Sequence, residues 1–98
     1  MSEFEKAKDA LQKGRFDDAL KQFAEIVENE EDNPIAHAYH ALALARLGAD
    51  ELAAEAMWKA NAKAKNGPIV KLDAKDSQPK NLDKAIEAAI KYLEVQEE

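Results

Sequence analysis

Two histidines, His37 and His40, are the side chains of this chain best suited to bind a metal ion. They lie three residues apart, so both imidazoles would face the same side of a helix and could share a zinc ion. The chain contains no cysteine, however, and no third ligand stands at a matching spacing. We therefore expect a structural role for both histidines, and neither a metal nor a cofactor.

Catalytic groups are scarce in the sequence. The aliphatic hydroxyl side chains are Ser2 and Ser77, because threonine is absent. The sequence has neither a glycine-rich phosphate loop nor a nucleophile elbow. Carboxylate pairs such as Asp17–Asp18 are explained by helix capping or by exposure to solvent. We expect that the protein is not an enzyme.

The charge of the chain argues against two classes of partner. The 98 residues have a net charge of −6, of which −5 falls within residues 1–32 and −2 within 67–98. A nucleic acid is not expected as a partner, because its phosphates would be repelled and no basic stripe occurs. A membrane is not expected either, since no stretch approaches the roughly 18 apolar residues of a membrane span. The acidic N-terminus, unlike a signal peptide, and the absence of cysteine favour a cytoplasmic protein.

The elements that position these residues follow from a repeat with a period of 34 residues. Glycine, alanine and apolar residues recur at equal offsets, as Gly14, Ala19, Phe23 and Ile26 in one copy and as Gly48, Ala53, Met57 and Ala60 in the next. A period of this length is typical of helix–turn–helix repeats. We expect an all-α fold.

The spacing of apolar residues predicts five helices, over about 2–13, 18–29, 34–47, 51–65 and 81–96. Gly14 and Gly48 are expected to end the first and third helices in the left-handed conformation. Asp17 or Asp18 is expected to cap the second helix, and Asp50 the fourth.

The segment after the fourth helix departs from this pattern. A short apolar run, Ile69–Leu72, precedes a polar stretch that contains Pro79. We predict an irregular connection over 67–80. Earlier in the chain, Pro34 suits the first turn of the third helix.

The repeated residues resemble the tetratricopeptide repeat (TPR) family, whose units are helical hairpins with small residues where the helices cross. The matching small positions are Ala7, Gly14 and Ala19 in the first unit and Ala41, Gly48 and Ala53 in the second. The resemblance implies one domain over 1–98, a right-handed α-solenoid. Repeat one covers about 2–31, repeat two about 34–66, and a C-terminal helix about 81–96. That helix is expected to cap the end of the solenoid, because each unit buries its apolar side against a neighbour.

Members of this family generally bind a peptide or helix in a concave groove lined by the first helix of each unit. The resemblance therefore implies a protein–protein interaction module, such as a scaffold or an adaptor. The groove positions carried over are Phe4, Lys8, Leu11 and Gln12 from the first helix and Ala38, Tyr39, Leu42 and Arg46 from the third. An acidic group of the partner would meet Arg46. The alternative interpretation places Phe4, Leu11 and Leu42 in the core, and for Leu11 and Leu42 the sequence supports both interpretations equally.

Other interpretations stay open at this point. The chain could self-associate as a homodimer through the solenoid end and the last helix. It could also be a fragment, or an engineered repeat with no partner. Trp58 is either a contact for a partner or is packed beneath residues 69–72.

Overall fold

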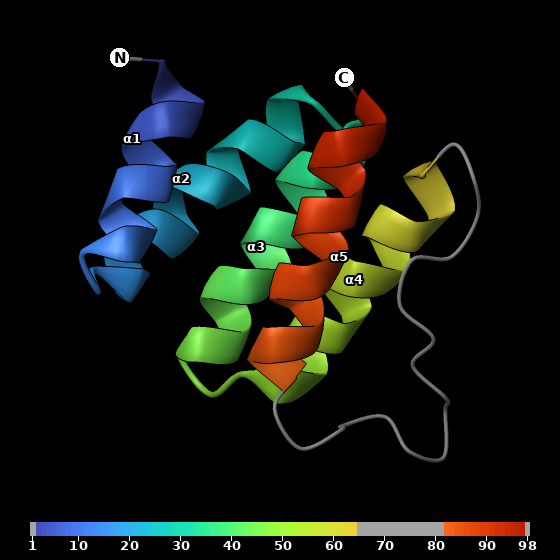
Figure 1. Ribbon diagram of the computed structural model, residues 1–98. Helices are drawn as coiled ribbons and strands as arrows, with labels where there is room; N and C mark the ends of the chain where they lie inside the picture. Colours follow the sequence, from blue (N-terminus) through green and yellow to red (C-terminus); the bar gives the residue numbers. More distant parts are fainter. Residues whose placement is uncertain (1, 65–81, 98) are drawn as a thin grey trace.

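The regular elements of the protein are helices throughout the part of the chain that the computed structural model describes, residues 2–64 and 82–97 (Figure 1). They are α1 (Glu3–Gln12), α2 (Phe16–Asn29), α3 (Pro34–Arg46), α4 (Asp50–Lys63) and α5 (Leu82–Glu97). The expected all-α fold is confirmed. The predicted irregular connection over 67–80 lies outside the described residues.

The turns of the two hairpins, α1–α2 and α3–α4, have the same geometry. Gly14 has a φ of +79° and Gly48 a φ of +84°, in the left-handed region that glycine favours. In each turn the residue after the glycine donates a backbone hydrogen bond to the carbonyl five positions earlier. These bonds run from Arg15 to Ala10 and from Ala49 to Leu44, both at 2.9 Å. The 34-residue period of the sequence therefore reproduces one helix-ending motif twice.

The second helix of each hairpin begins earlier than predicted. Arg15 is the N-cap of α2 and Ala49 is the N-cap of α4, and neither side chain accepts a capping hydrogen bond. The prediction that Asp17, Asp18 and Asp50 act as caps is wrong. The turn leaves one residue between the glycine and the helix, so these acidic residues fall in the first turn. There their negative charge is favoured by the helix dipole.

Side-chain caps occur instead at the start of each hairpin. The Ser2 hydroxyl accepts a hydrogen bond from the backbone N–H of Glu5 at 3.1 Å. The Asn33 side-chain oxygen accepts one from the N–H of Ile35 at 3.0 Å. Pro34 follows as the first residue of α3, which confirms its predicted place in the first turn.

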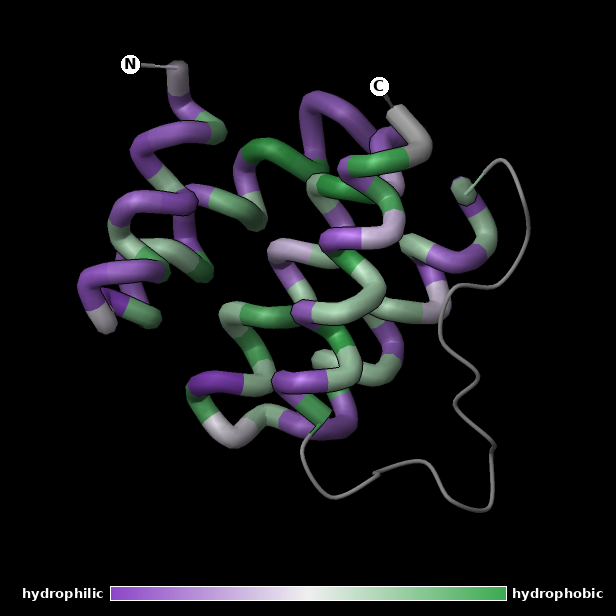
Figure 2. The backbone as a smooth tube through the Cα atoms, viewed as in Figure 1, coloured by the Kyte–Doolittle hydropathy of each residue, from purple (hydrophilic) through white to green (hydrophobic). Residues whose placement is uncertain are grey.

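Helix α3 is the centre of the fold, because α2, α4 and α5 all pack against it (Figure 1). Figure 2 shows α3 as mostly apolar along its length, whereas α1 is largely hydrophilic. A helix that is enclosed on several sides needs apolar residues on several faces. The buried residues of α3 are Pro34, Ala36, His37, Ala38, Tyr39, Ala41, Leu42, Ala43 and Leu44. The alanines let neighbouring helices approach closely.

Helix α5 contributes one apolar face to the core. Its buried residues are Leu82, Ile86, Ala89, Ile90 and Leu93, and this face packs against α3. The sequence analysis predicted this apolar face correctly, but it expected the face to cover the end of a solenoid. In the structure α5 lies along α3 and borders the groove described below. None of the described helices combines the length and the apolar character needed to cross a membrane.

Candidate partner-binding groove

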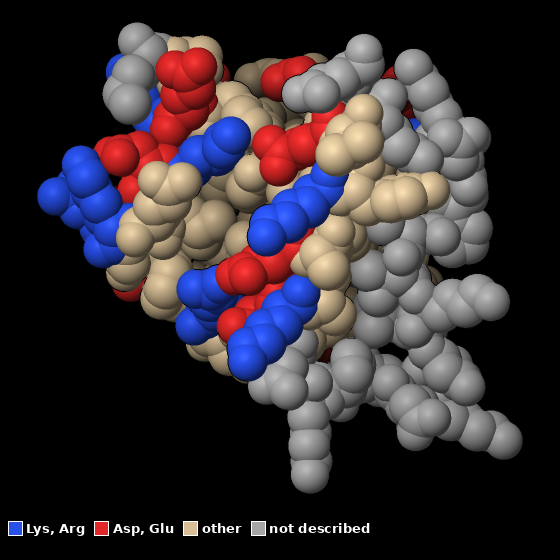
Figure 3. Space-filling model, in the orientation of Figure 1, with Lys and Arg blue, Asp and Glu red and all other residues tan. Residues whose placement is uncertain are grey.

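A groove lies between α1 and α5, with α3 beneath it, and has a volume of about 260 Å³. Its lining residues are Leu11, Gln12, Tyr39, Leu42, Arg46, Glu87, Ile90, Lys91 and Glu94. Leu11, Leu42 and Ile90 are largely buried and form an apolar floor. Figure 3 shows this face of the molecule, where basic and acidic side chains surround a hollowed area of uncharged residues.

Five of the eight groove residues named from the sequence line this groove. Leu11 and Leu42 are both core residues and part of the groove floor, so the two interpretations of these leucines are compatible. Phe4 and Lys8 contact Tyr39 and lie beside the lining residues. Ala38 is 0% exposed and is not among the residues that line the groove, so its assignment to the groove is wrong.

The ring of Tyr39 belongs to an aromatic cluster that joins α1, α2 and α3. It stacks on Phe23, with ring centroids 5.4 Å apart and an interplanar angle of 11°. Phe4 meets it edge-on at 5.3 Å, and the ammonium of Lys8 lies 5.6 Å from its centroid. The position of this groove residue is therefore determined by the core.

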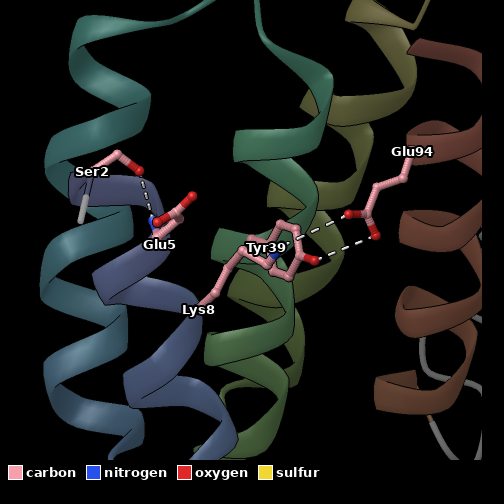
Figure 4. Close-up of polar contacts among 5 residues, drawn as sticks. All are labelled: Ser2, Glu5, Lys8, Tyr39 and Glu94. Carbon is pink, nitrogen blue, oxygen red and sulfur yellow. Dashed lines mark hydrogen bonds and ion pairs between the residues drawn. The ribbon is translucent and has the colours of Figure 1, made fainter. Parts of the chain in front are cut away.

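Glu94 of α5 connects Tyr39 and Lys8 across the groove (Figure 4). The Tyr39 hydroxyl donates a hydrogen bond to Glu94 Oε1 at 3.4 Å, and Lys8 Nζ lies 3.9 Å from Glu94 Oε2. Burial of the phenol raises the pKa of Tyr39 to about 12, with a further contribution from the negative charge of Glu94. Tyr39 is therefore a neutral hydrogen-bond donor at physiological pH.

Arg46 is engaged by α5 at the other end of the groove. Its guanidinium forms ion pairs with Glu87 and, at 3.4 Å, with Asp83. It also lies over the ring of Phe16, 5.9 Å from the centroid. An acidic group of a partner, which the sequence placed at Arg46, would compete with two carboxylates of the same chain.

The sequence interpretation missed the contribution of α5 to this groove. Glu87, Ile90, Lys91 and Glu94 line it, yet none was named as a groove residue. One signal was available, because the acidic residues of α5 recur beside its apolar stripe at helical spacing. The spacing alone did not indicate which helices would supply the partners of these acidic residues.

The two histidines lie on the side of α3 that packs against α2 and α4. His37 is buried, and its Nε2–H donates a hydrogen bond to the carbonyl oxygen of Glu31 at 2.7 Å. Burial lowers the pKa of His40, and the charges of His37 and Lys59 lower it further. His37 thus has the structural role expected for it. Over residues 2–64 and 82–97, no three His, Cys, Asp or Glu side chains are grouped so as to hold a metal ion.

Trp58 lies outside the groove, on α4. Its side chain is 57% exposed, which makes it one of the most exposed large apolar residues among those described. Residues 69–72, beneath which it was predicted to pack, lie outside the described part of the chain. That packing stays a prediction.

Comparisons of the chain with protein-family models, with curated proteins and with solved structures found no match.

Proposed function

We propose that the protein is a protein–protein interaction module that binds a helix or an extended segment of a partner on its concave face, along α3 and beside α1. The two hairpins with equivalent turns support an assignment to the TPR-like α-solenoids, in which this face binds partners. Such a module would act as an adaptor or scaffold.

The observation that carries this proposal is the groove itself. Three helices supply its lining, its floor is apolar, and its rim carries both donors and acceptors. Peptide-binding surfaces combine these features, because apolar anchors provide affinity and polar groups fix the register. The volume of about 260 Å³ is slightly below the roughly 300–1,000 Å³ of pockets that enclose small molecules. The groove is therefore better suited to a few side chains of a peptide than to a whole small-molecule ligand.

A peptide selection tests the proposal directly. Peptides selected from a random display library against the intact protein would be measured by fluorescence anisotropy against the variants Gln12→Trp and Lys21→Trp. Gln12 is exposed and lines the groove, whereas Lys21 is exposed on α2 and does not line it. Both variants gain an indole on a helix surface, but only the first fills the groove.

We expect Gln12→Trp to weaken binding at least about tenfold, which is roughly 1.4 kcal/mol, and Lys21→Trp to leave it unchanged. Equal affinities for the two variants would show that selected peptides bind elsewhere. In that case the groove is not the binding site, and the proposal fails.

A further inference from the structure

Helix α5 has the pattern of an acidic amphipathic helix. Asp83, Glu87 and Glu94 stand at positions i, i+4 and i+11, which at 100° per residue places them within about 40° of one another around the helix. The adjoining face carries the buried residues Leu82, Ile86, Ile90 and Leu93. One stripe of carboxylates therefore runs beside one apolar stripe.

The partners of this acidic stripe are the polar groups that the groove would offer to another protein. Arg46 pairs with Asp83 and Glu87, and Glu94 meets Lys8 and the Tyr39 hydroxyl (Figure 4). The apolar stripe packs on α3 at the same time. This combination of apolar anchors and matched charges is how an amphipathic helix is recognised in a groove.

We propose that the concave face recognises an acidic amphipathic helix, that α5 is its resident occupant, and that a partner helix with the pattern of α5 binds by taking its place. This inference rests on the proposed function and adds the chemistry of the partner. It also makes α5 a competitor that limits access to α3.

The energetics of the contacts are compatible with such an exchange. The side chains of the ion pairs are 32–43% exposed, and pairs this open to solvent contribute little to stability. Burial of the apolar stripe therefore supplies most of the stability of the docked helix, while the charges set its orientation. A partner helix with the same pattern would remake both kinds of contact.

What distinguishes α5 from a partner helix is its covalent attachment. A tethered segment competes at an effective concentration on the order of millimolar. The apparent affinity for a partner equals the intrinsic affinity multiplied by the fraction of molecules in which α5 is undocked. Weakening the docked α5 should therefore strengthen the binding of a partner helix.

The probe for this inference is a fluorescein-labelled peptide with the sequence of residues 82–97, added to the full-length protein. The variant Glu87→Lys places a cation against Arg46 and weakens the docked α5. The matched control Glu55→Lys makes the same change at an exposed position on α4, away from the groove. We expect Glu87→Lys to bind the peptide about three- to tenfold more tightly than the wild type, because an ion pair is lost and a repulsion is added, and Glu55→Lys to match the wild type. A peptide with Lys at positions 83, 87 and 94 should bind at least about tenfold more weakly.

A second measurement keeps the inference testable if Glu87→Lys fails to fold. The chain has no cysteine, so the variant Lys8→Cys/Glu94→Cys can be bridged at one place by a short bismaleimide, which holds α5 on α1. The control is the same variant with both thiols capped by N-ethylmaleimide. We expect the bridged form to lose peptide binding. The capped form shares the loss of Lys8 and Glu94, so it should bind the peptide more weakly than the wild type but measurably more tightly than the bridged form.

Two results would overturn the inference. If the bridged and capped forms bind the peptide equally, the peptide lies beside α5 and does not replace it. If no form binds the peptide at millimolar concentration, the face does not recognise an acidic amphipathic helix in trans. Neither result changes the outcome of the Gln12→Trp test, so a failure of this inference is distinguishable from a failure of the proposed function.

Discussion

Tyr39 of α3 donates a hydrogen bond to Glu94 of α5, 55 residues later in the chain. The ring of Tyr39 stacks on Phe23 in the core, while its hydroxyl reaches the rim of the groove. One side chain thus links the packing of the two hairpins to the position of α5. A change at this residue should affect both the stability of the fold and the docking of the last helix.

The variant Tyr39→Phe keeps the ring and removes the hydroxyl. We expect it to lower the free energy of unfolding by about 0.5–1.5 kcal/mol at neutral pH, because one hydrogen bond is lost. Urea denaturation followed by circular dichroism measures this change. The variant Tyr39→Ala, which also removes the buried ring, should cost about 3–5 kcal/mol. A Tyr39→Phe variant as unstable as Tyr39→Ala would show that the hydroxyl has a larger role than a single bond.

The same residue predicts a loss of stability at alkaline pH. The pKa of Tyr39 is about 12 in the folded protein, above the value of about 10 for an unfolded chain. The unfolded state therefore releases this proton first as the pH rises. The contribution of Tyr39 is complete below pH 10 and is lost between about pH 10 and pH 12. Denaturation of the wild type and of Tyr39→Phe across this range should show a difference in stability that shrinks as the pH rises.

His40 predicts a loss of stability in the acidic direction. Its pKa in the folded protein is lowered by burial, by His37 and by Lys59, whereas in the unfolded chain it is about 6.5. The unfolded state therefore binds this proton first as the pH falls. The wild type should lose stability below about pH 6.5, down through the lower pKa of the folded state. The variant His40→Gln should have a flatter profile over that range, and identical profiles would contradict the prediction.

The two turn glycines should respond equally to substitution. A Cβ atom added at Gly14 or Gly48 would have no heavy atom within 4 Å, so the cost of alanine comes from the positive φ alone. We expect Gly14→Ala and Gly48→Ala each to lower the free energy of unfolding by about 1–2 kcal/mol. Asparagine tolerates this conformation better, so Gly14→Asn and Gly48→Asn should recover part of the loss. Unequal losses at the two turns would show that their equivalence does not extend to their energetics.

The small residues of α3 should not tolerate larger side chains. Ala41 is 0% exposed at the centre of the fold, so Ala41→Leu should cost about 1–3 kcal/mol through overpacking. The control Ala62→Leu makes the same change at an exposed position on α4 and should stay within about 0.5 kcal/mol of the wild type. Thermal and urea denaturation of both variants check this prediction.

Part of the groove could be predicted from the sequence because it depends on local features. Leu11, Tyr39 and Leu42 fall on predictable faces of the first and third helices, and both of these helices pack against α2, which places them at one groove. Ala38 was assigned wrongly because it stands next to Tyr39 on the same helix, yet its own side chain is fully enclosed by the packing around α3. The pairing of Arg46 with Asp83 was not predictable, since it depends on where a distant helix docks.

The sequence by itself determined the helices, the two hairpins and their turns. These follow from interactions within a few residues, such as the left-handed glycines and the apolar spacing of each helix. The tertiary structure decided which surface α5 occupies and therefore which charges of the groove are already paired. The apolar stripe of α5 identifies a face to be buried but not its neighbour, because hydrophobic burial is non-directional. That choice is made by the charges and shapes of α1 and α3 once they are assembled.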